Sequence, residues 1–371
     1  LSLSRRYLFL DPGDVVQTAG RRLRLTGSHQ SGGLLHMEAV DHFQPANSSA
    51  ATGDAGAVRP AASAAQFSIL YLMDLPPLRA EDDQPGIYAA VSGAPGWRGA
   101  SLWRAADGID YRLIDNFTGA VVAGMALTAL ASSAPEMIDR AHSVDVQLLQ
   151  GTLAGCGDLD LLNGANAALL GGEIIQFRAA TLLGPGHYRL SNLLRGRRGT
   201  ETGIGVHMAG ENFVLLDRRA VKFLPLPASG RERTHHYRAL VSGQSLGDTP
   251  DFAVTNILRT LQPLAPVHLQ GTRSAGAGSD LALSWIRRAR LNAEWADHID
   301  VPLDETQELY DLEILDGGDV VRTVSGLTAP AYLYTAAQQS ADFTIIPASY
   351  DVRVYQCSPR YGRGAAANAA V

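Results

Sequence analysis

Glycine recurs at short intervals through this chain, and that spacing constrains its fold more than any other feature. The sequence has 38 glycines and 18 prolines in 371 residues, and they separate short apolar runs. Short apolar runs bounded by these residues are typical of β-strands, because glycine and proline supply the backbone angles of tight turns. We therefore predict a mainly β chain of several barrel and sandwich domains.

Helical patterns are few and short. The best helix candidates are residues 133–141 and 158–170, and neither has the long amphipathic period of a surface helix. Within the strand-like block of residues 138–217, Gly184-Pro185-Gly186 predicts a hairpin turn. The chain is therefore expected to place its chemistry-bearing residues on strands and turns.

Changes in composition divide the chain into four parts. Residues 1–45 are expected to be a β-rich segment that continues an upstream domain, because the sequence begins within a strand-like run. Residues 46–65 are rich in alanine, serine and glycine, which predicts a linker or loop. Residues 66–260 return to strand-like runs and predict further β-rich domains, and residues 261–371 change in character again.

The last part, 261–371, predicts a small sandwich, since its strand-like runs recur about 10 to 15 positions apart. Trp285 stands where the second strand of a fibronectin type III domain carries its core tryptophan. Tyr350, followed by alternating valines, stands at the position of the tyrosine corner. We predict a fibronectin type III-like domain, a fold that assigns no function by itself.

Composition argues against several functional classes. The net charge of -6 and pI near 5.9 are unlike those of a dedicated duplex-DNA binder. Cys156 and Cys357 imply neither a disulfide framework nor a zinc site. No run is apolar for long enough to span a membrane, and no nucleophile elbow, phosphate loop or His-Glu-x-x-His motif occurs. We expect a protein that is not an enzyme and has no cofactor, metal site or catalytic residue.

Several polar or aromatic groups permit two interpretations. The acidic stretch Asp158, Asp160, Asn163 and Glu173 superficially suggests a calcium loop, but its spacing is wrong for an EF-hand. We favour a short helix capped by Asp158 or Asp160 and a turn at Asn163-Gly164.

Histidines offer no assignable metal site either. His235 and His236 are adjacent, and neighbours on a strand point to opposite faces, so we expect ordinary surface or interface residues. Three others, His29, His36 and His42, could approach one another in the first segment, although nothing in the sequence requires it.

Two further groups are open to a functional interpretation. Glu81, Asp82 and Asp83 form an acidic run that we interpret as a solvated loop. Three aromatic side chains could line a sugar-binding platform, namely Trp97, Trp103 and Tyr111. We favour core packing for most of them.

The sequence RGRRG places Arg195, Arg197 and Arg198 within four positions. Such arginines beside glycine amides could grip phosphate. We favour instead arginines that tie strands or subunits together through carboxylates, because the chain is acidic overall. Four acidic residues are close enough in sequence to pair with them: Glu173, Glu201, Glu211 and Asp217.

An ordered series of sequence motifs in this chain resembles that of a known protein family. The sequence has DPGDVV near its start, then LLNGANAALLGGEIIQFRAATLLGPGHYRLSNLLRGRRGTE, then HMAGENFVLLD. This series resembles the tail-tip hub proteins of long-tailed phages, and most of all the family of large gene transfer agent baseplate proteins nicknamed megatron. The resemblance extends over most of the chain, including LEILDGG and YTAAQQSADF in its last part.

The resemblance implies a structural part of a DNA-delivery tail. Such hubs are typically homotrimers at the tail tip that contact other baseplate hub and distal tail proteins and the host cell envelope. They close the tail tube and let DNA pass without binding it specifically, which fits the acidic balance. The resemblance transfers no catalytic residue to this chain. Two alternatives remain: a host-surface glycan-binding adhesin, and a cell-wall hydrolase using Glu81 or Asp83.

Overall fold

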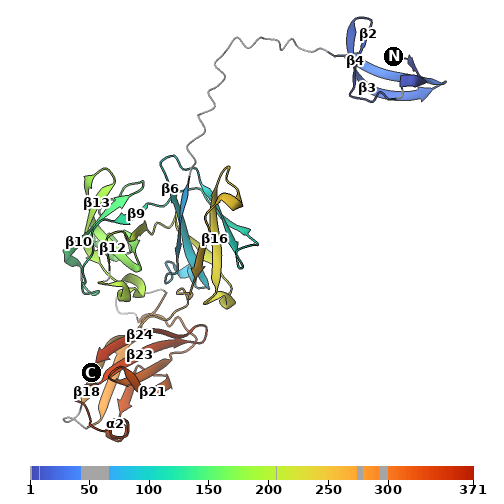
Figure 1. The fold of residues 1–371 in the computed structure, drawn as a ribbon. Helices are drawn as coiled ribbons and strands as arrows, with labels where there is room; N and C mark the ends of the chain where they lie inside the picture. Colours follow the sequence, from blue (N-terminus) through green and yellow to red (C-terminus); the bar gives the residue numbers. More distant parts are fainter. Residues whose placement is uncertain (1, 8, 43–66, 206, 274–278, 292–299) are drawn as a thin grey trace. The chain divides into compact units, whose positions relative to one another are not determined.

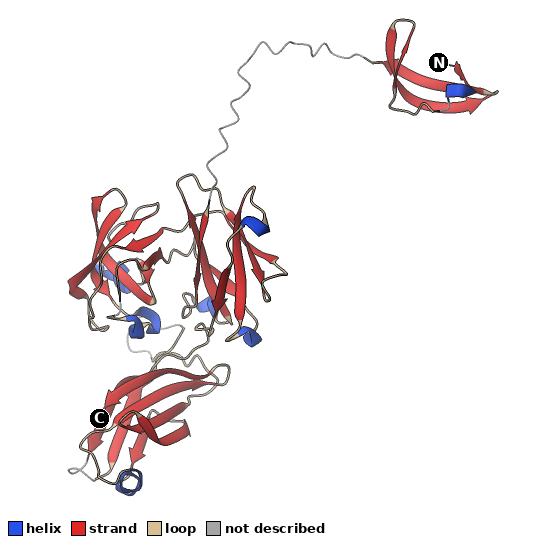
Figure 2. Ribbon diagram, in the orientation of Figure 1, coloured by secondary structure: helices blue, strands red, loops and turns tan. Residues whose placement is uncertain are grey.

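The computed structural model describes residues 2–7, 9–42, 67–205, 207–273, 279–291 and 300–371. The chain divides into two compact units, residues 1–65 and 66–371. Strands make up 49% of the structure and helices 9%, which confirms the prediction of a mainly β chain (Figure 2). The predicted linker, residues 46–65, lies outside the described residues. Among the described helices, none has the length and apolar character needed to cross a membrane.

The first unit is one four-stranded antiparallel sheet in the order β1-β4-β3-β2 (Figure 1). Its strands are β1 (Ser2–Ser4), β2 (Val15–Thr18), β3 (Arg21–Ser31) and β4 (Leu34–Asp41), with a 3-10 turn at Arg5–Tyr7. Among the described residues of this unit, Leu25, Leu35 and Met37 are buried in a hydrophobic cluster, and partly buried side chains pack against it: Leu3, Leu10, Val16 and Ala39.

The second unit contains a closed barrel of six strands in the order β10-β13-β12-β11-β14-β9. Its strands, of which Figure 1 labels β9, β10, β12 and β13, are β9 (Ala123–Ala126), β10 (Asp139–Leu148), β11 (Ala167–Leu170), β12 (Glu173–Gly184), β13 (His187–Leu194) and β14 (Asn212–Leu215). The predicted hairpin joins β12 and β13 through Pro185 and Gly186, and Gly186 has φ +67°, which favours glycine. Alternate side chains of the strands fill an apolar interior.

Two open sheets complete the central part of this unit. One, in the order β15-β6-β5, has β5 (Ser68–Met73), β6 (Gly86–Gly93) and β15 (Lys222–Pro225). The other, in the order β17-β16-β7-β8, has β7 (Ala100–Ala105), β8 (Arg112–Phe117), β16 (Thr234–Val241) and β17 (Phe252–Thr255). Every residue of β6 is buried, because one of its faces packs toward the barrel and the other toward the second sheet. The barrel and the two sheets thus form one continuous body.

The last part is a seven-stranded sandwich of sheets β18-β19-β22 and β21-β20-β23-β24. This strand order is that of a fibronectin type III-like domain, as the sequence predicts. Its elements are β18 (Val267–Arg273), β19 (Leu281–Ile286), β20 (Tyr310–Asp316), β21 (Asp319–Leu327), β22 (Ala331–Tyr334), α2 (Ala336–Asp342), β23 (Asp351–Ser358) and β24 (Gly362–Ala370).

Trp285 on β19 and Tyr350 beside β23 are 3% and 1% exposed, and both belong to the apolar core of the sandwich. The Tyr350 hydroxyl donates to Oε1 of Gln339 at 2.9 Å. The two positions taken from the fibronectin pattern therefore lie inside this core.

Both helix predictions need correction. Residues 133–138 form no helix, and strand β10 begins at Asp139 because this segment pairs with β9 and β13. Of 158–170, only α1 (Asp158–Leu162) is helical, and Ala167–Leu170 forms β11 in the barrel. Pairing within the closed barrel overrides the local preference of these residues.

Candidate functional site

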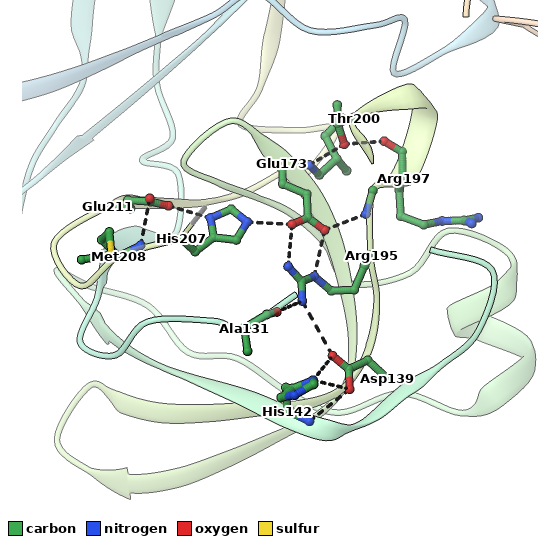
Figure 3. A network of polar contacts seen from close by, with 12 residues as sticks. Ala131, Asp139, His142, Glu173, Arg195, Arg197, Thr200, His207, Met208 and Glu211 are labelled. Atoms are coloured by element: carbon green, nitrogen blue, oxygen red, sulfur yellow. Dashed lines mark hydrogen bonds and ion pairs between the residues drawn. The ribbon is translucent and has the colours of Figure 1, made fainter. Parts of the chain in front are cut away.

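The end of the barrel where β12 starts and β13 finishes carries a buried network of charges. Glu173 is the first residue of β12, and Arg195 follows the last residue of β13. Because β12 and β13 pair antiparallel with Gln176 opposite Leu194, the register brings these two charged residues together. Figure 3 shows Glu173 at the centre of the network.

Arg195 and Glu173 form a bidentate ion pair. The Nε and Nη2 atoms of Arg195 donate to the two carboxylate oxygens of Glu173 at 2.9 and 2.8 Å. Both side chains are 0% exposed. The remaining Nη1 donates to the carbonyl of Ala131 at 2.9 Å and lies 3.7 Å from the Asp139 carboxylate. The guanidinium is thus held by partners from several segments of the barrel.

Gly196 allows the chain to turn at this point. Its backbone N–H donates to Glu173 Oε1 at 2.6 Å, and its φ of 57° lies in the left-handed region. A side chain here would place its Cβ 2.9 Å from the Cα of Glu201. A glycine between Arg195 and Arg197 is therefore required by the local backbone rather than by a ligand.

His207 joins Glu173 to Glu211. Its Nε2 lies 2.6 Å from a Glu173 oxygen, and its Nδ1 lies 2.7 Å from a Glu211 oxygen. With a carboxylate on each ring nitrogen, the imidazolium is the form that donates to both. The hydrogen bond that His207 donates to Glu173, supported by the one that it donates to Glu211, raises the pKa of His207 despite its burial.

Burial by itself would raise the pKa of Glu173, but hydrogen bonds outweigh that effect. Donors on His207, Arg195 and Gly196 hold the pKa of this carboxyl below its usual range. Both of its oxygens are therefore fully used as acceptors at neutral pH. The site has the character of a structural centre, since no lone pair of Glu173 remains for a substrate.

Asp139 extends the network at its other end. Its carboxylate accepts from the backbone N–H groups of Ala141 and His142 at 3.1 and 3.0 Å, and His142 Nδ1 lies 3.0 Å from Oδ2. Although burial opposes ionisation, these contacts hold the pKa of Asp139 below its usual range. Basic and acidic side chains therefore alternate along the series of contacts that runs from His142 to Glu211 (Figure 3).

The other two arginines of RGRRG have different partners. Arg197 Nε donates to Gln176 Oε1 at 2.8 Å, and Arg198, with φ 57°, donates from Nη1 to the carbonyl of Pro77 at 2.9 Å. Glu201 accepts instead from Arg288, which lies just after β19, at 2.7 Å. Among the four acidic residues expected to pair with the turn, Glu173 makes the ion pair with Arg195.

The other candidate acids have partners as well. Glu81 pairs with Arg218 on the surface at 3.2 Å, and Asp83 pairs with Arg290 and Arg360 at 3.2 and 3.0 Å. These contacts favour a structural interpretation of Asp83 over a hydrolytic one. Asp82, expected in a solvated loop, is instead buried and accepts from the Tyr88 hydroxyl at 2.7 Å.

The supposed calcium loop and the histidine pair also need partial correction. The residue before α1 is Gly157, and no side chain caps this helix, so neither Asp158 nor Asp160 is its cap. Asn163 and Gly164 do lie in a turn. On β16, His235 is buried and is therefore not a surface residue, whereas His236 bonds through Nδ1 to Asp251 at 2.6 Å.

The three candidate platform aromatics have partners within the chain. Trp97 packs on the core between the open sheets, and its Nε1 donates to Ser68 at 3.0 Å. Trp103 donates to Ser101 at 3.0 Å, and the guanidinium of Arg238 lies 4.5 Å from the centre of the Tyr111 ring. These contacts favour packing over sugar binding for these residues.

Sequence reasoning missed three members of the network, namely Asp139, His142 and His207. The signal for His207 is its position four residues before Glu211, within the motif series. The signal for Asp139 and His142 is weaker, because their role follows from a bulge in β10 between Asp139 and Ser143.

Comparison with known proteins adds one finding about the barrel. The family model described as "Rcc01698-like, C-terminal" matches residues 121–214. This segment is similar to a family associated with the gene transfer agent of Rhodobacter. The matched residues run from just before β9 into β14, so the likeness covers the barrel and its charge network.

The other two comparisons add little. No curated protein matches the chain. A solved structure titled "Central Fibronectin-III array of RIM-binding protein" is similar at 11% identity over 81% of this chain and 95% of that chain, with a TM-score of 0.20. That TM-score is too low to support an argument, and the sandwich is assigned from its own strand order.

Proposed function

We propose that this chain is a structural part of the tail-tip hub of a phage-like particle of the gene transfer agent type. In this proposal it assembles as a homotrimer with other baseplate proteins at the tail tip, helps to close the tail tube and borders the route by which DNA leaves. The observation that carries the proposal is the family match over residues 121–214, which coincides with the barrel.

The chemistry of the barrel supports a structural role. Its most polar buried group, Glu173, is saturated by Arg195, Gly196 and His207. Removing one partner from a buried ion pair is costly, so such a network fixes one arrangement of the strands that it joins. A component that must hold its shape inside a large assembly has a use for that rigidity.

Cryo-electron microscopy of intact particles tests the location. We expect density for this chain on the tail axis at the tip, in three copies. Density for the chain at a peripheral fibre, away from the axis, would contradict the proposal and favour a host-surface adhesin.

Single substitutions separate assembly from DNA handling. Arg195→Ala should give particles that lack tips or assemble poorly, because it leaves Glu173 buried without its cation. Arg198→Ala, at an exposed position of the same turn, should leave tips and marker transfer intact. Electron microscopy scores the tips, and transfer of a marker gene scores delivery.

Normal tips with failed, salt-sensitive transfer in Arg198→Ala particles would assign the turn to the DNA conduit. Normal tips in Arg195→Ala particles would contradict the structural role of the network.

A further inference from the structure

The sandwich meets the rest of the second unit through arginine side chains that share one carboxylate. Arg290, which follows β19, donates from Nη2 to Asp83 Oδ1 at 3.2 Å and from Nη1 to the carbonyl of Thr260 at 2.6 Å. Arg360, in the turn between β23 and β24, donates from Nη1 to the two carboxylate oxygens of Asp83 at 3.0 and 3.1 Å. Asp83 is thus the common partner of two arginines from different parts of the sandwich.

Two further arginines bridge the same junction. Arg288 of the sandwich donates to Glu201, which lies between β13 and β14 of the barrel, at 2.7 Å. In the opposite direction, Arg231 before β16 donates to the carbonyl of Tyr361 at 2.6 Å, and its guanidinium lies 3.8 Å from the centre of the Tyr361 ring. We call these contacts and the two made by Asp83 the arginine seam.

Apolar packing contributes less across this junction. Among the described residues, no hydrophobic cluster has members on both sides of residues 259–268, which connect the two parts. Within this connection Leu264 packs on Gly199 of the barrel, where an added Cβ would lie 2.4 Å from Leu264 Cδ2. Parts of a chain that meet through a small polar interface can move relative to each other. The arginine seam therefore decides whether the sandwich stays docked.

We propose that the arginine seam is a salt-sensitive latch, which holds the sandwich on the rest of the second unit and releases it as one body. Asp83 is the central residue of this latch, because its loss deprives both Arg290 and Arg360 of a carboxylate. The side chains of Asp83 and Arg360 are 34% and 43% exposed, so dissolved ions can reach and screen this pair.

The latch can open because its most buried cation keeps a second partner. The Arg290 side chain is 3% exposed, and a buried charge left without a partner would make release costly. Glu305 lies 3.5 Å from the same Nη2 atom, and it belongs to the sandwich. After release Arg290 therefore retains a carboxylate on its own side of the junction.

Release of the sandwich leaves the charge network of the barrel in place. Glu201 and Gly199 lie in the turn that contains RGRRG, and they contact the sandwich and its connection. Arg195 in the same turn has its partners, Glu173 and Ala131, inside the barrel. The latch and the network can therefore be tested separately.

A distance measurement between two spin labels on the full-length chain tests the proposal. The labels are attached at Thr181→Cys on β12 and Thr323→Cys on β21, two exposed positions, after Cys156→Ser and Cys357→Ser. At about 0.05 M NaCl we expect one narrow distance distribution, and at about 1 M a second, broad population, because charges are then screened beyond about 3 Å. Asp83→Asn should show the broad population at low salt, with the ratio of undocked to docked chains raised about fivefold or more.

A matched pair of arginines supplies the control. Arg360 and Arg363 have side chains that are 43% and 39% exposed, but Arg363 pairs with Asp311 and Glu313 inside the sandwich. Arg360→Ala should widen the distance distribution, whereas Arg363→Ala should leave it at its wild-type width. Amide hydrogen exchange in β6 and β23 shows whether both parts stay folded, and Arg360→Ala carries the test if Asp83→Asn does not fold.

Three results would overturn the proposal. The first is one narrow distribution in the folded Asp83→Asn or Arg360→Ala variant and in the wild type at high salt. The second is equal widening in Arg360→Ala and Arg363→Ala, since the effect would then not belong to the junction. The third is a broad distribution in the wild type at low salt, because the sandwich would then not be docked at all.

Discussion

The barrel and the sandwich both enclose polar side chains, but they do so with different chemistry. In the barrel, Glu173, Arg195 and His207 form a charged network. In the sandwich, Gln339 is also 0% exposed, yet its amide donates to the carbonyls of Tyr334 and Ser279 at 2.8 and 2.9 Å. Its Oε1 accepts from the Tyr350 hydroxyl.

This difference predicts how much stability each core loses when one polar side chain is removed. A neutral hydrogen bond contributes about 1 kcal/mol net, whereas an ion pair broken on one side leaves a buried charge that costs several times more. The barrel should therefore be sensitive to single substitutions in its network, and the sandwich should tolerate loss of one hydroxyl.

The largest effect is expected for Arg195→Ala. It should lower the free energy of unfolding of the barrel by about 3 to 5 kcal/mol, because Glu173 stays buried without a bidentate partner. Amide hydrogen exchange in β12 and β13 measures this loss locally. A loss below about 1 kcal/mol would show that the network contributes no more than an exposed ion pair.

The next effect concerns pH and depends on His207. Its pKa is raised in the folded chain, so its contribution is fully present below its unfolded value, near 6.5, and is lost as pH rises through the folded value. One such proton changes stability by at most about 1.4 kcal/mol per pH unit. Glu173, whose pKa is lowered, contributes above its unfolded value near 4.5 and loses that contribution as pH falls.

Exchange in β12 and β13 should therefore become faster as pH rises above 6.5, after correction for the intrinsic effect of pH on exchange. His207→Gln should remove this alkaline loss, and the difference between the two proteins isolates the imidazole from other groups. Parallel pH profiles for the two proteins would contradict the assignment of the titration to His207.

A smaller effect is expected in the sandwich for Tyr350→Phe. This variant should destabilise the sandwich by about 1 kcal/mol, because Gln339 Oε1 keeps a second donor, Arg273 Nη1, at 3.1 Å. Tyr332→Phe is the control, since Tyr332 is half-buried and donates to Gln338 at 3.2 Å. Exchange in β23 gives the measurement. A loss as large as that of Arg195→Ala would remove the contrast between the two cores.

The smallest effect is expected for Arg189→Ala. Arg189 lies on β13, the strand that Arg195 directly follows. Arg189 is exposed and forms a bidentate pair with Asp145 at 2.7 and 2.8 Å, so its pairing chemistry matches that of Arg195. Exchange in β12 and β13 should change less than in Arg195→Ala, since the Arg189 side chain is half exposed and Asp145 keeps His187 at 3.4 Å. Comparable losses at Arg189 and Arg195 would show that burial does not account for the sensitivity of the network.

Parts of this arrangement follow from local sequence, because turns depend on few neighbouring residues. Gly184-Pro185-Gly186 predicts its hairpin since glycine tolerates the backbone angles that the turn needs. Trp285 and Tyr350 mark the sandwich because strand spacing and aromatic position together restrict the fold. The helix predicted at 133–141 was wrong and that at 158–170 was right only for Asp158–Leu162, because closure of the barrel recruits Asp139–Leu148 and Ala167–Leu170 as strands.

By itself the sequence determined that this is a mainly β chain, that it ends in a sandwich, and that Arg195 has carboxylates within reach. Only the tertiary structure decided which carboxylate is the partner, because Glu173 and Arg195 are 22 positions apart and meet through the register of β12 and β13. It also decided that His207 completes the network and that His29 faces His36. Burial and pairing across strands are properties of the closed sheet, and no local pattern specifies them.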